Sequence, residues 1–199
     1  MEMSTARERA KSTVFNLVST LEKKGIRVVA VDFDQTLIKI HSGGIWKDST
    51  DNLAKHIRPC MKDLLETALQ QELIVCIVTF HSQPWVIREL LKSLLKKDAE
   101  KIYVQANTIE FRERHNYEYL GKEAHITAVL TEVYNKHKII IKPDEIILFD
   151  DDLDNVDTAL KFGHWAFQIK DDVSYQTFEE YSKILALQDR PVGIKGKRR

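Results

Sequence analysis

Short apolar runs rich in β-branched residues recur along the chain, and segments of helical length separate them. The runs lie at residues 26–33, 73–78, 102–105, 146–149 and 165–169. Their nearly continuous apolar character is typical of strands that are covered on both faces. Strands that alternate with helices in this way predict right-handed crossovers and a parallel sheet between two helical layers. We therefore expect an α/β fold with a three-layer, doubly wound parallel sheet.

Apolar residues at three- and four-residue spacing predict helices between and before these strands. One helix, over residues 4–24, precedes the sheet and ends at Gly25. A later helix, over residues 122–137, has an apolar face made of Ile126, Val129, Leu130 and Val133. The first helix is outside the strand–helix alternation, so we expect an additional N-terminal helix before the sheet.

Capping residues and prolines predict how the middle of the chain is divided. Asp51 is expected to cap a helix that Pro59 interrupts or restarts, and Pro84 opens a further helix that ends at about residue 96. The pattern leaves residues 107–120 unassigned.

Composition places the chain among ordinary globular proteins. Its 199 residues are 43% hydrophobic and 30% charged, which favours one domain with a core and excludes a disordered chain. The 30 Lys and Arg residues balance 30 Asp and Glu residues, so no overall charge attracts a polyanion. Two cysteines, Cys60 and Cys76, are too few for a disulfide framework. No run approaches the roughly 18 apolar residues of a membrane span, and we expect a cytoplasmic protein without a membrane partner.

The chain ends in a basic segment. Residues 190–199 hold five basic residues and no acidic one. We expect a single domain over residues 1–189, with its core at about 26–170, followed by this basic tail. The tail is either a solvated terminus or an element that contacts a nucleic-acid backbone, and nothing else in the sequence supports nucleic acid as a partner.

Carboxylates follow two of the predicted strands. Asp32 and Asp34 come after the first strand, and Asp150 and Asp151 come after the fourth. Ligands of open α/β sheets bind beyond the carboxyl ends of the strands, so we expect these four side chains in one cleft. Like charges in a cleft repel and raise each other's pKa values unless a cation lies between them. Oxygen ligands of this kind suit Mg²⁺.

Four motifs occur in a fixed order along the chain. They are an apolar strand with Asp32-Phe-Asp34-Gln-Thr36, a strand that ends in Thr79, Gly121-Lys122 at a helix start, and a strand with Asp150-Asp151. In this order they resemble the motifs of the haloacid dehalogenase-like (HAD) superfamily of hydrolases, over about residues 26–170. The resemblance implies a HAD-like Rossmannoid sheet with a small flap.

The resemblance also implies the activity of a phosphatase. Asp32 would be the nucleophile that forms an aspartyl-phosphate, and Asp34 would protonate the leaving oxygen and then activate water. Thr79 would donate a hydrogen bond to the phosphoryl group, and Lys122 would neutralise its charge. The acid at position 34 argues against a dehalogenase. Competing lysines for this role are Lys136, Lys138 and Lys142.

A magnesium site follows from the same resemblance. Its ligands would be the Asp32 carboxylate, the main-chain carbonyl of Asp34 and the carboxylates of Asp150 and Asp151. Three consecutive acids leave the register open, and Asp152 is the alternative ligand. Where many relatives have a further Asp, this chain has Asn155, which can still orient an acid or a water molecule.

Residues 41–46 are expected to form a turn or small flap, because they contain two consecutive glycines. The flanking His41 and Trp46 either cover the site or simply end the turn. The residues after the second motif either line the substrate entrance or only start a helix; they are His81, Ser82 and Gln83. His115 and His125 have no zinc-ligand spacing, so they are interpreted as surface or helix residues.

The connections between the motifs are too short for a separate cap domain. The resemblance therefore implies an open site, which would accept a phosphoprotein, a nucleic-acid end or a small phosphate ester. The leading hypothesis is a Mg²⁺-dependent phosphomonoester hydrolase with a phosphorylated small molecule or macromolecule as substrate. Two alternatives are a phosphate-binding or scaffold protein with little turnover, and a nucleic-acid-end phosphatase that uses the basic tail.

Overall fold

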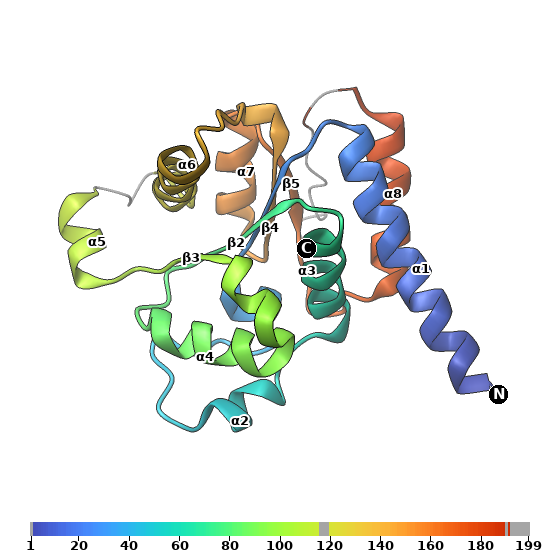
Figure 1. The fold of residues 1–199 in the computed structure, drawn as a ribbon, viewed down its shortest axis with the longest axis horizontal. Helices are drawn as coiled ribbons and strands as arrows, with labels where there is room; N and C mark the ends of the chain where they lie inside the picture. Colours follow the sequence, from blue (N-terminus) through green and yellow to red (C-terminus); the bar gives the residue numbers. More distant parts are fainter. Residues whose placement is uncertain (1, 116–119, 190, 192–199) are drawn as a thin grey trace.

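The chain folds around one parallel sheet, and its computed structural model describes residues 2–115, 120–189 and 191 (Figure 1). The first half contains α1 (Glu2–Lys23), β1 (Val28–Val31), the tight turn η1 (Phe33–Leu37), α2 (Thr50–Ala54), α3 (Pro59–Gln70), β2 (Ile74–Val78), α4 (Pro84–Leu95), the 3₁₀ segment η2 (Lys96–Lys101) and β3 (Tyr103–Gln105). The second half contains α5 (Ile109–Arg114), α6 (Glu123–His137), the 3₁₀ turn η3 (Pro143–Glu145), β4 (Ile146–Asp150), α7 (Leu153–Lys161), β5 (Trp165–Gln168) and α8 (Tyr175–Leu187).

The sheet has the order β3-β2-β1-β4-β5, and every strand pair in it is parallel. Strand β1 lies at the centre, with Val28 in register with Ile74 of β2 on one side and Ile146 of β4 on the other. The chain first adds strands on the β2 side and then returns to the β4 side. The change of direction makes the carboxyl ends of β1 and β4 a topological switch point, where such sheets bind ligands.

Successive strand residues face opposite sides of the sheet, and each side is covered by its own helices. On one side, Val29 and Val31 join a core that includes buried residues of α1, α3, α4 and α8. On the other side, Val28 and Ala30 pack against apolar residues of α6 and α7. Figure 1 shows these two helical layers around the sheet. The predicted three-layer α/β fold with a parallel sheet is therefore confirmed.

The first helix packs against the last one. Apolar α1 residues, including Leu17 and Leu21, are fully buried in the same core as Phe178 and Leu185 of α8. A polar cluster joins the same layer, because Asp63 of α3 accepts hydrogen bonds from Arg7 of α1 (Nη2 to Oδ1, 2.7 Å) and from the Tyr175 hydroxyl of α8 (2.6 Å). Asp63 is 4% exposed, so three helices meet at one buried carboxylate.

One sequence prediction needs correction. The helix that Asp51 was expected to cap is capped by Ser49, whose side chain accepts a hydrogen bond from the Asn52 amide, and Asp51 lies in its first turn. Ser49 is preferred because the chain is extended there, with φ −66° and ψ 154°. His125 is a helix residue of α6, one of the two predicted alternatives, and it is fully buried.

The remaining boundaries agree with the prediction to within a few residues. Pro59 restarts the chain as a separate helix, and Pro84 opens α4. The unassigned segment contains the short α5, whose first turn is capped by Thr108. No helix among the described residues is long and apolar enough to cross a membrane. The predicted basic tail falls on residues 190–199, of which all but Pro191 lie outside the described residues, so the domain boundary at 189 stays a prediction.

Candidate active site

A cavity of about 330 Å³ opens at the carboxyl ends of β1 and β4. It lies at the switch point of the sheet, as expected for a ligand site in this architecture. Side chains from four sequence-distant segments line it, including all six residues singled out by the sequence. Its lining includes Asp32, Asp34, Thr79, Lys122, Asp150 and Asp151.

The turn η1 determines where the two acids of the first motif lie. Asp32 still belongs to the strand ladder, since its amide donates to the Phe149 carbonyl at 2.9 Å. Within the turn Gln35 has φ 56°, an uncommon conformation for a residue with a side chain. The guanidinium of the buried Arg58 holds this turn by donating to the Gln35 carbonyl (3.2 Å) and to the Asp171 carbonyl (2.7 Å). The reversal after Asp32 brings Asp34 back to the same cavity.

A buried ion pair lies at the centre of the site. The Lys122 ammonium donates to Asp32 Oδ1 at 2.6 Å and lies 3.9 Å from Asp150 Oδ2. The exposed fractions of Asp32, Lys122 and Asp150 are 4%, 3% and 0%. The ammonium also lies 3.8 Å from the centre of the Phe80 ring, which is a cation–π contact. Burial raises the pKa of Asp32, although the charge and hydrogen bond of Lys122 oppose this.

The residue before Lys122, Gly121, packs closely against α7. Gly121 has φ +51°, and a Cβ atom there would lie 3.1 Å from Asn155 Oδ1 and 3.4 Å from Asn155 Cα. A side chain at position 121 would therefore push the start of α6 away from α7. Lys122 itself is the N-cap residue of α6. The competing lysines lie farther along the chain, with Lys136 and Lys138 at the opposite end of α6, near Tyr103 and Tyr134.

Asp150 is a fully buried carboxylate with only part of its hydrogen-bonding capacity used. Its Oδ1 accepts hydrogen bonds from the Asp152 amide (2.9 Å) and from Asn155 Nδ2 (3.0 Å). Its Oδ2 accepts no hydrogen bond from the described part of the chain. Burial, and then the charge of Asp32, raise the pKa of Asp150. Asn155 therefore orients this acid, one of the two roles that the sequence left open for it.

Asp151 and Asp152 differ in their surroundings. Asp151 accepts hydrogen bonds from Gln35 Nε2 (3.1 Å) and Thr36 Oγ1 (3.3 Å), so it is tied to the first motif. Burial raises the pKa of Asp151. Asp152 is exposed, and its Oδ1 caps α7 by accepting from the Asp154 amide at 2.8 Å. The capping role favours Asp150 and Asp151 over Asp152 as ligands of a cation.

Asp34 is held by the flap, defined here as residues 41–46. The Ser42 hydroxyl donates to Asp34 Oδ2 at 2.7 Å, and the Gly44 amide donates to the same hydroxyl oxygen at 3.2 Å. His41 Nδ1 lies 3.6 Å from the same Oδ2. Asp34 Oδ1 is buried and accepts no hydrogen bond from the described residues. One oxygen of Asp34 is thus fixed, and the other is available to move a proton.

The flap is docked on the segment that follows β2. The Gly44 carbonyl accepts from the amide and the hydroxyl of Ser82, both at 2.8 Å, and Gln83 Oε1 accepts from the Trp46 amide at 2.6 Å. Thr79 is buried at the end of β2 and accepts from the His81 amide through Oγ1 at 3.1 Å. Of the residues predicted to line the entrance, His81 contributes to the cavity wall, whereas Ser82 and Gln83 anchor the flap.

The donor set fits a hard divalent cation. Buried Asp32 and Asp150 face the same space with raised pKa values, and Asp150 Oδ2 lacks a hydrogen bond from any described residue. A bound cation would offset this repulsion between carboxylates. In the described residues, no three His, Cys, Asp or Glu side chains converge closely enough to hold a metal ion. A cation here would therefore need main-chain carbonyl and water oxygens as well, which Mg²⁺ commonly accepts.

Sequence reasoning missed the hydroxyl that orients Asp34. Ser42 is an ordinary turn residue in the sequence, and no spacing connects it with the first motif. The bond from Gln35 to Asp151 was also missed, because it joins residues that are 116 positions apart. Two further residues, Glu123 and His164, form a buried pair next to Lys122 and had no sequence signal.

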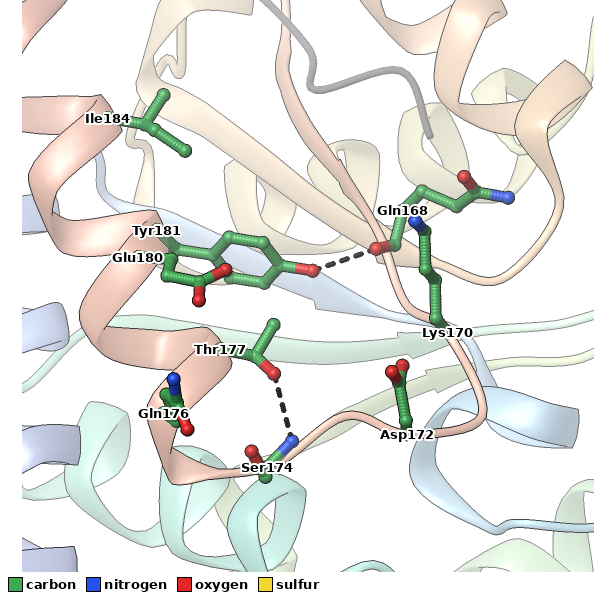
Figure 2. Close-up of a pocket in the computed structure, with 9 residues that line it drawn as sticks. All are labelled: Gln168, Lys170, Asp172, Ser174, Gln176, Thr177, Glu180, Tyr181 and Ile184. Carbon is green, nitrogen blue, oxygen red and sulfur yellow. Dashed lines mark hydrogen bonds between the residues drawn. The ribbon is translucent and has the colours of Figure 1, made fainter. Parts of the chain in front are cut away.

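A second cavity, of about 440 Å³, lies between the end of β5 and α8. Figure 2 shows its lining, where the Tyr181 hydroxyl donates to the Gln168 carbonyl at 2.8 Å. The Gln168 side chain donates to the Asp151 carbonyl at 3.0 Å. The second cavity contains none of the six predicted site residues, but Gln168 connects its wall with the candidate active site.

Three solved structures are similar to this chain. A HAD-superfamily hydrolase from Ehrlichia chaffeensis is similar to this chain with a TM-score of 0.53 and 12% identity, over 81% of this chain and 98% of its own. A haloacid dehalogenase-like family hydrolase from Streptococcus pneumoniae has a TM-score of 0.46 and 14% identity, over 80% of this chain and 91% of its own. A proposed phosphatase from Clostridium difficile has a TM-score of 0.45 and 18% identity, over 72% of this chain and 84% of its own. No family model and no curated protein matches the sequence.

The chain therefore has the fold of the HAD-superfamily hydrolases. The HAD-like fold that the sequence resemblance implied is confirmed by the Ehrlichia chaffeensis structure, which matches over 98% of its length.

Proposed function

We propose that this protein is a Mg²⁺-dependent phosphomonoester hydrolase. The observation that carries the proposal is the buried Lys122–Asp32 pair beside Asp150, at the switch point of a sheet with the HAD-hydrolase fold. A lysine paired with a buried carboxylate next to a second buried carboxylate fits a site that binds a phosphoryl group and a cation together. The hydrolase names of the structural neighbours agree with this chemistry.

In the first step, an Asp32 carboxylate oxygen attacks phosphorus and the ester P–O bond breaks, which gives an aspartyl-phosphate and an alcohol. Asp34 donates a proton to the departing oxygen through Oδ1, the atom that accepts no hydrogen bond from the described chain. Lys122 balances charge on Asp32 and on the phosphoryl oxygens, and the Thr79 hydroxyl donates to one of those oxygens. Ser42 keeps Asp34 in place through Oδ2.

In the second step, Asp34 accepts a proton from water, which attacks phosphorus. The bond between Asp32 and phosphorus breaks, and inorganic phosphate leaves. When bound, Mg²⁺ would supply electrostatic stabilisation of the phosphoryl oxygens, held by Asp32, the Asp34 carbonyl, Asp150 and Asp151. Asn155 keeps the Asp150 carboxylate oriented throughout, because it donates to Oδ1.

The substrate is a phosphate monoester on a small molecule or a macromolecule. The flap is the element that borders the cavity on the side of Asp34, and His41, Gly43 and Gly44 line the cavity there. We propose that the site has no separate cap domain and is open to solvent beyond this flap. A cytoplasmic location agrees with the free, buried Cys60 and Cys76 and stays a prediction.

The decisive experiment measures phosphate release from an aryl phosphate and from a panel of phosphate esters, with Mg²⁺ and with excess chelator. We expect turnover by the wild type that requires Mg²⁺ and that Asp32→Asn reduces by at least about 10³-fold, because the nucleophile is lost. Circular dichroism of Asp32→Asn checks that the fold is retained. Near-normal turnover by this variant would remove Asp32 as the nucleophile.

The same panel separates the alternatives. Binding of inorganic phosphate with no turnover of any ester would favour a phosphate-binding or scaffold protein. Activity limited to 5′- or 3′-phosphorylated oligonucleotides, and lost on deletion of residues 190–199, would favour a nucleic-acid-end phosphatase.

A further inference from the structure

A second buried ion pair lies directly beside the candidate active site. His164, which precedes β5, places Nε2 at 3.1 Å from Glu123 Oε2 and Nδ1 at 2.8 Å from the Pro143 carbonyl oxygen. His164 is 4% exposed and Glu123 is 7% exposed. Neither residue lines the active-site cavity. The pair joins residues that are 41 positions apart, so it connects the start of α6 to the segment between α7 and β5.

The partners of His164 determine its protonation state. A carbonyl oxygen only accepts hydrogen bonds, so Nδ1 carries a proton toward Pro143. An ionised Glu123 carboxylate is also an acceptor, so this contact favours a second proton on Nε2 and the imidazolium form of the ring. Burial alone would lower the pKa of His164. The hydrogen bonds with Glu123 and with the Pro143 carbonyl, together with the charge of Glu123, outweigh burial and raise the pKa. In the imidazolium form the contact is a charge-assisted bond between a cation and a carboxylate.

Glu123 is the first residue of α6 and directly follows Lys122, its N-cap. The two neighbouring side chains have separate partners, because Lys122 contacts Asp32 while Glu123 contacts His164. On the other side of Lys122, Gly121 packs against Asn155 of α7. Lys122 is thus fixed from both sides, by close packing at position 121 and by an ion pair at position 123.

A lysine side chain has four rotatable bonds, so its ammonium reaches a fixed position only if its backbone is fixed and its stem is packed. Lys122 meets the second condition through burial and the Phe80 contact. The first turn of a helix is its least stable part, because its amides lack partners within the helix. A buried pair at the first residue of α6 supplies the missing constraint.

We propose that Glu123 and His164 are positioning residues for Lys122, and that their ion pair fixes the first turn of α6 so that the ammonium contacts Asp32. The inference rests on the proposed phosphatase function for its catalytic consequence. It assigns no contact with substrate or metal to either residue. Its structural consequence, an ordered first turn of α6, does not depend on which reaction the site performs.

The test compares Glu123→Gln and His164→Gln with the wild type. We expect each variant to lower kcat by about 10- to 100-fold, because a displacement of about 1 Å at a catalytic group has an effect of that size. KM should change less than twofold, since neither residue contacts substrate. Amide hydrogen exchange provides the second readout: the Ile126 amide, which donates to the Lys122 carbonyl at 2.9 Å, should exchange at least tenfold faster in both variants.

Asp63→Asn is the matched control, because it also removes the charge of a buried carboxylate in an ion pair, but between α1, α3 and α8. It should lower the melting temperature and leave both kcat and the exchange of Ile126 unchanged. Values of kcat within twofold of the wild type in both test variants would overturn the proposal, as would an equal loss of kcat in the control. A wild type with no phosphatase activity would contradict the proposed function instead, and unchanged Ile126 exchange would then still overturn the positioning role.

Discussion

At the scale of single residues, two buried carboxylates of the candidate active site repel each other. Asp32 and Asp150 are both buried at the ends of neighbouring strands, and burial raises the pKa of each. Lys122 offsets only part of the repulsion, because its ammonium is 2.6 Å from Asp32 but 3.9 Å from Asp150. We therefore expect Asp150 to lower the stability of the metal-free protein, a common property of functional sites.

Asp150→Asn should raise the melting temperature in excess chelator, because it removes a buried charge and leaves an oxygen that accepts from Asn155 and Asp152. Each kcal/mol of stabilisation corresponds to about 2–4 °C for a chain of this size. A pKa above the unfolded value means that Asp150 lowers stability as the pH rises from about 4 through its folded pKa, and the variant should lose this part of the pH dependence. Thermal melts with chelator and with Mg²⁺ at several pH values provide the measurement.

Asp144→Asn is the control for that experiment, because Asp144 is exposed and lies outside the cavity. Mg²⁺ should shift the melting temperature of Asp144→Asn by the same amount as that of the wild type. The wild type should gain stability from Mg²⁺, and Asp150→Asn should gain less. A variant that is less stable than the wild type in chelator would show that Asp150 is not under electrostatic strain.

At the scale of elements, the flap and α6 position the two sides of the site. The flap holds Asp34 through Ser42 and is itself held by Ser82 and Gln83. The start of α6 holds Lys122 from the other side. The two elements differ in length and anchoring, since α6 is a helix of 15 residues whereas the flap is a turn fixed by a few hydrogen bonds. The flap is therefore the element whose opening we expect to affect substrate binding.

Gln83→Ala should loosen the flap, because it removes the acceptor of the Trp46 amide bond. The loss of one partly buried hydrogen bond costs about 1 kcal/mol, so we expect KM for an aryl phosphate to rise about threefold to tenfold, with a smaller change in kcat. Steady-state kinetics measure both. Thr50→Ala is the control, since it breaks an exposed bond between α2 and Glu89 of α4 and should leave both constants unchanged. An unchanged KM in Gln83→Ala would show that the flap does not contribute to binding.

On the scale of the whole molecule, α1 and α8 close one side of the sheet and meet α3 at Asp63. Burial would raise the pKa of Asp63, but hydrogen bonds from Arg7 and Tyr175 outweigh it and lower the pKa. A carboxyl group whose folded pKa is below its unfolded value stabilises the protein above the unfolded pKa, near 4. The contribution is lost as the pH falls through the folded pKa. The polar cluster is therefore an acid-sensitive connection between three helices.

Asp63→Asn should destabilise the protein at pH 7 by about 1–3 kcal/mol, since a buried charged hydrogen bond is lost. The difference from the wild type should shrink as the pH falls toward 3, and urea unfolding at pH 7 and pH 3 measures it. Glu66→Gln on the same helix is the control, because its pair with Lys62 is a partly exposed i,i+4 contact worth less than about 0.5 kcal/mol. Equal effects of the two substitutions would show that burial adds nothing at Asp63.

The sequence by itself determined the layer architecture and the strand ends at which the acids lie. Apolar runs and helical spacing are local patterns, and parallel strands present their carboxyl ends at one edge, so Asp32, Asp34, Asp150 and Asp151 were expected together. Thr79 and Lys122 were predicted from the resemblance to the HAD motifs, in which they stand at a strand end and a helix start. The roles of these residues in catalysis and metal binding stay predictions.

Only the tertiary structure decided which side chains orient that site. Ser42 contacts Asp34 because the flap folds back after the turn η1, and His164 contacts Glu123 because the first residue of α6 meets the segment between α7 and β5. Ser49 rather than Asp51 caps α2 because its backbone is extended there. None of these contacts follows from the spacing of residues along the chain. They depend on how the helices and strands pack, and that packing is determined by the buried surfaces of all the elements together.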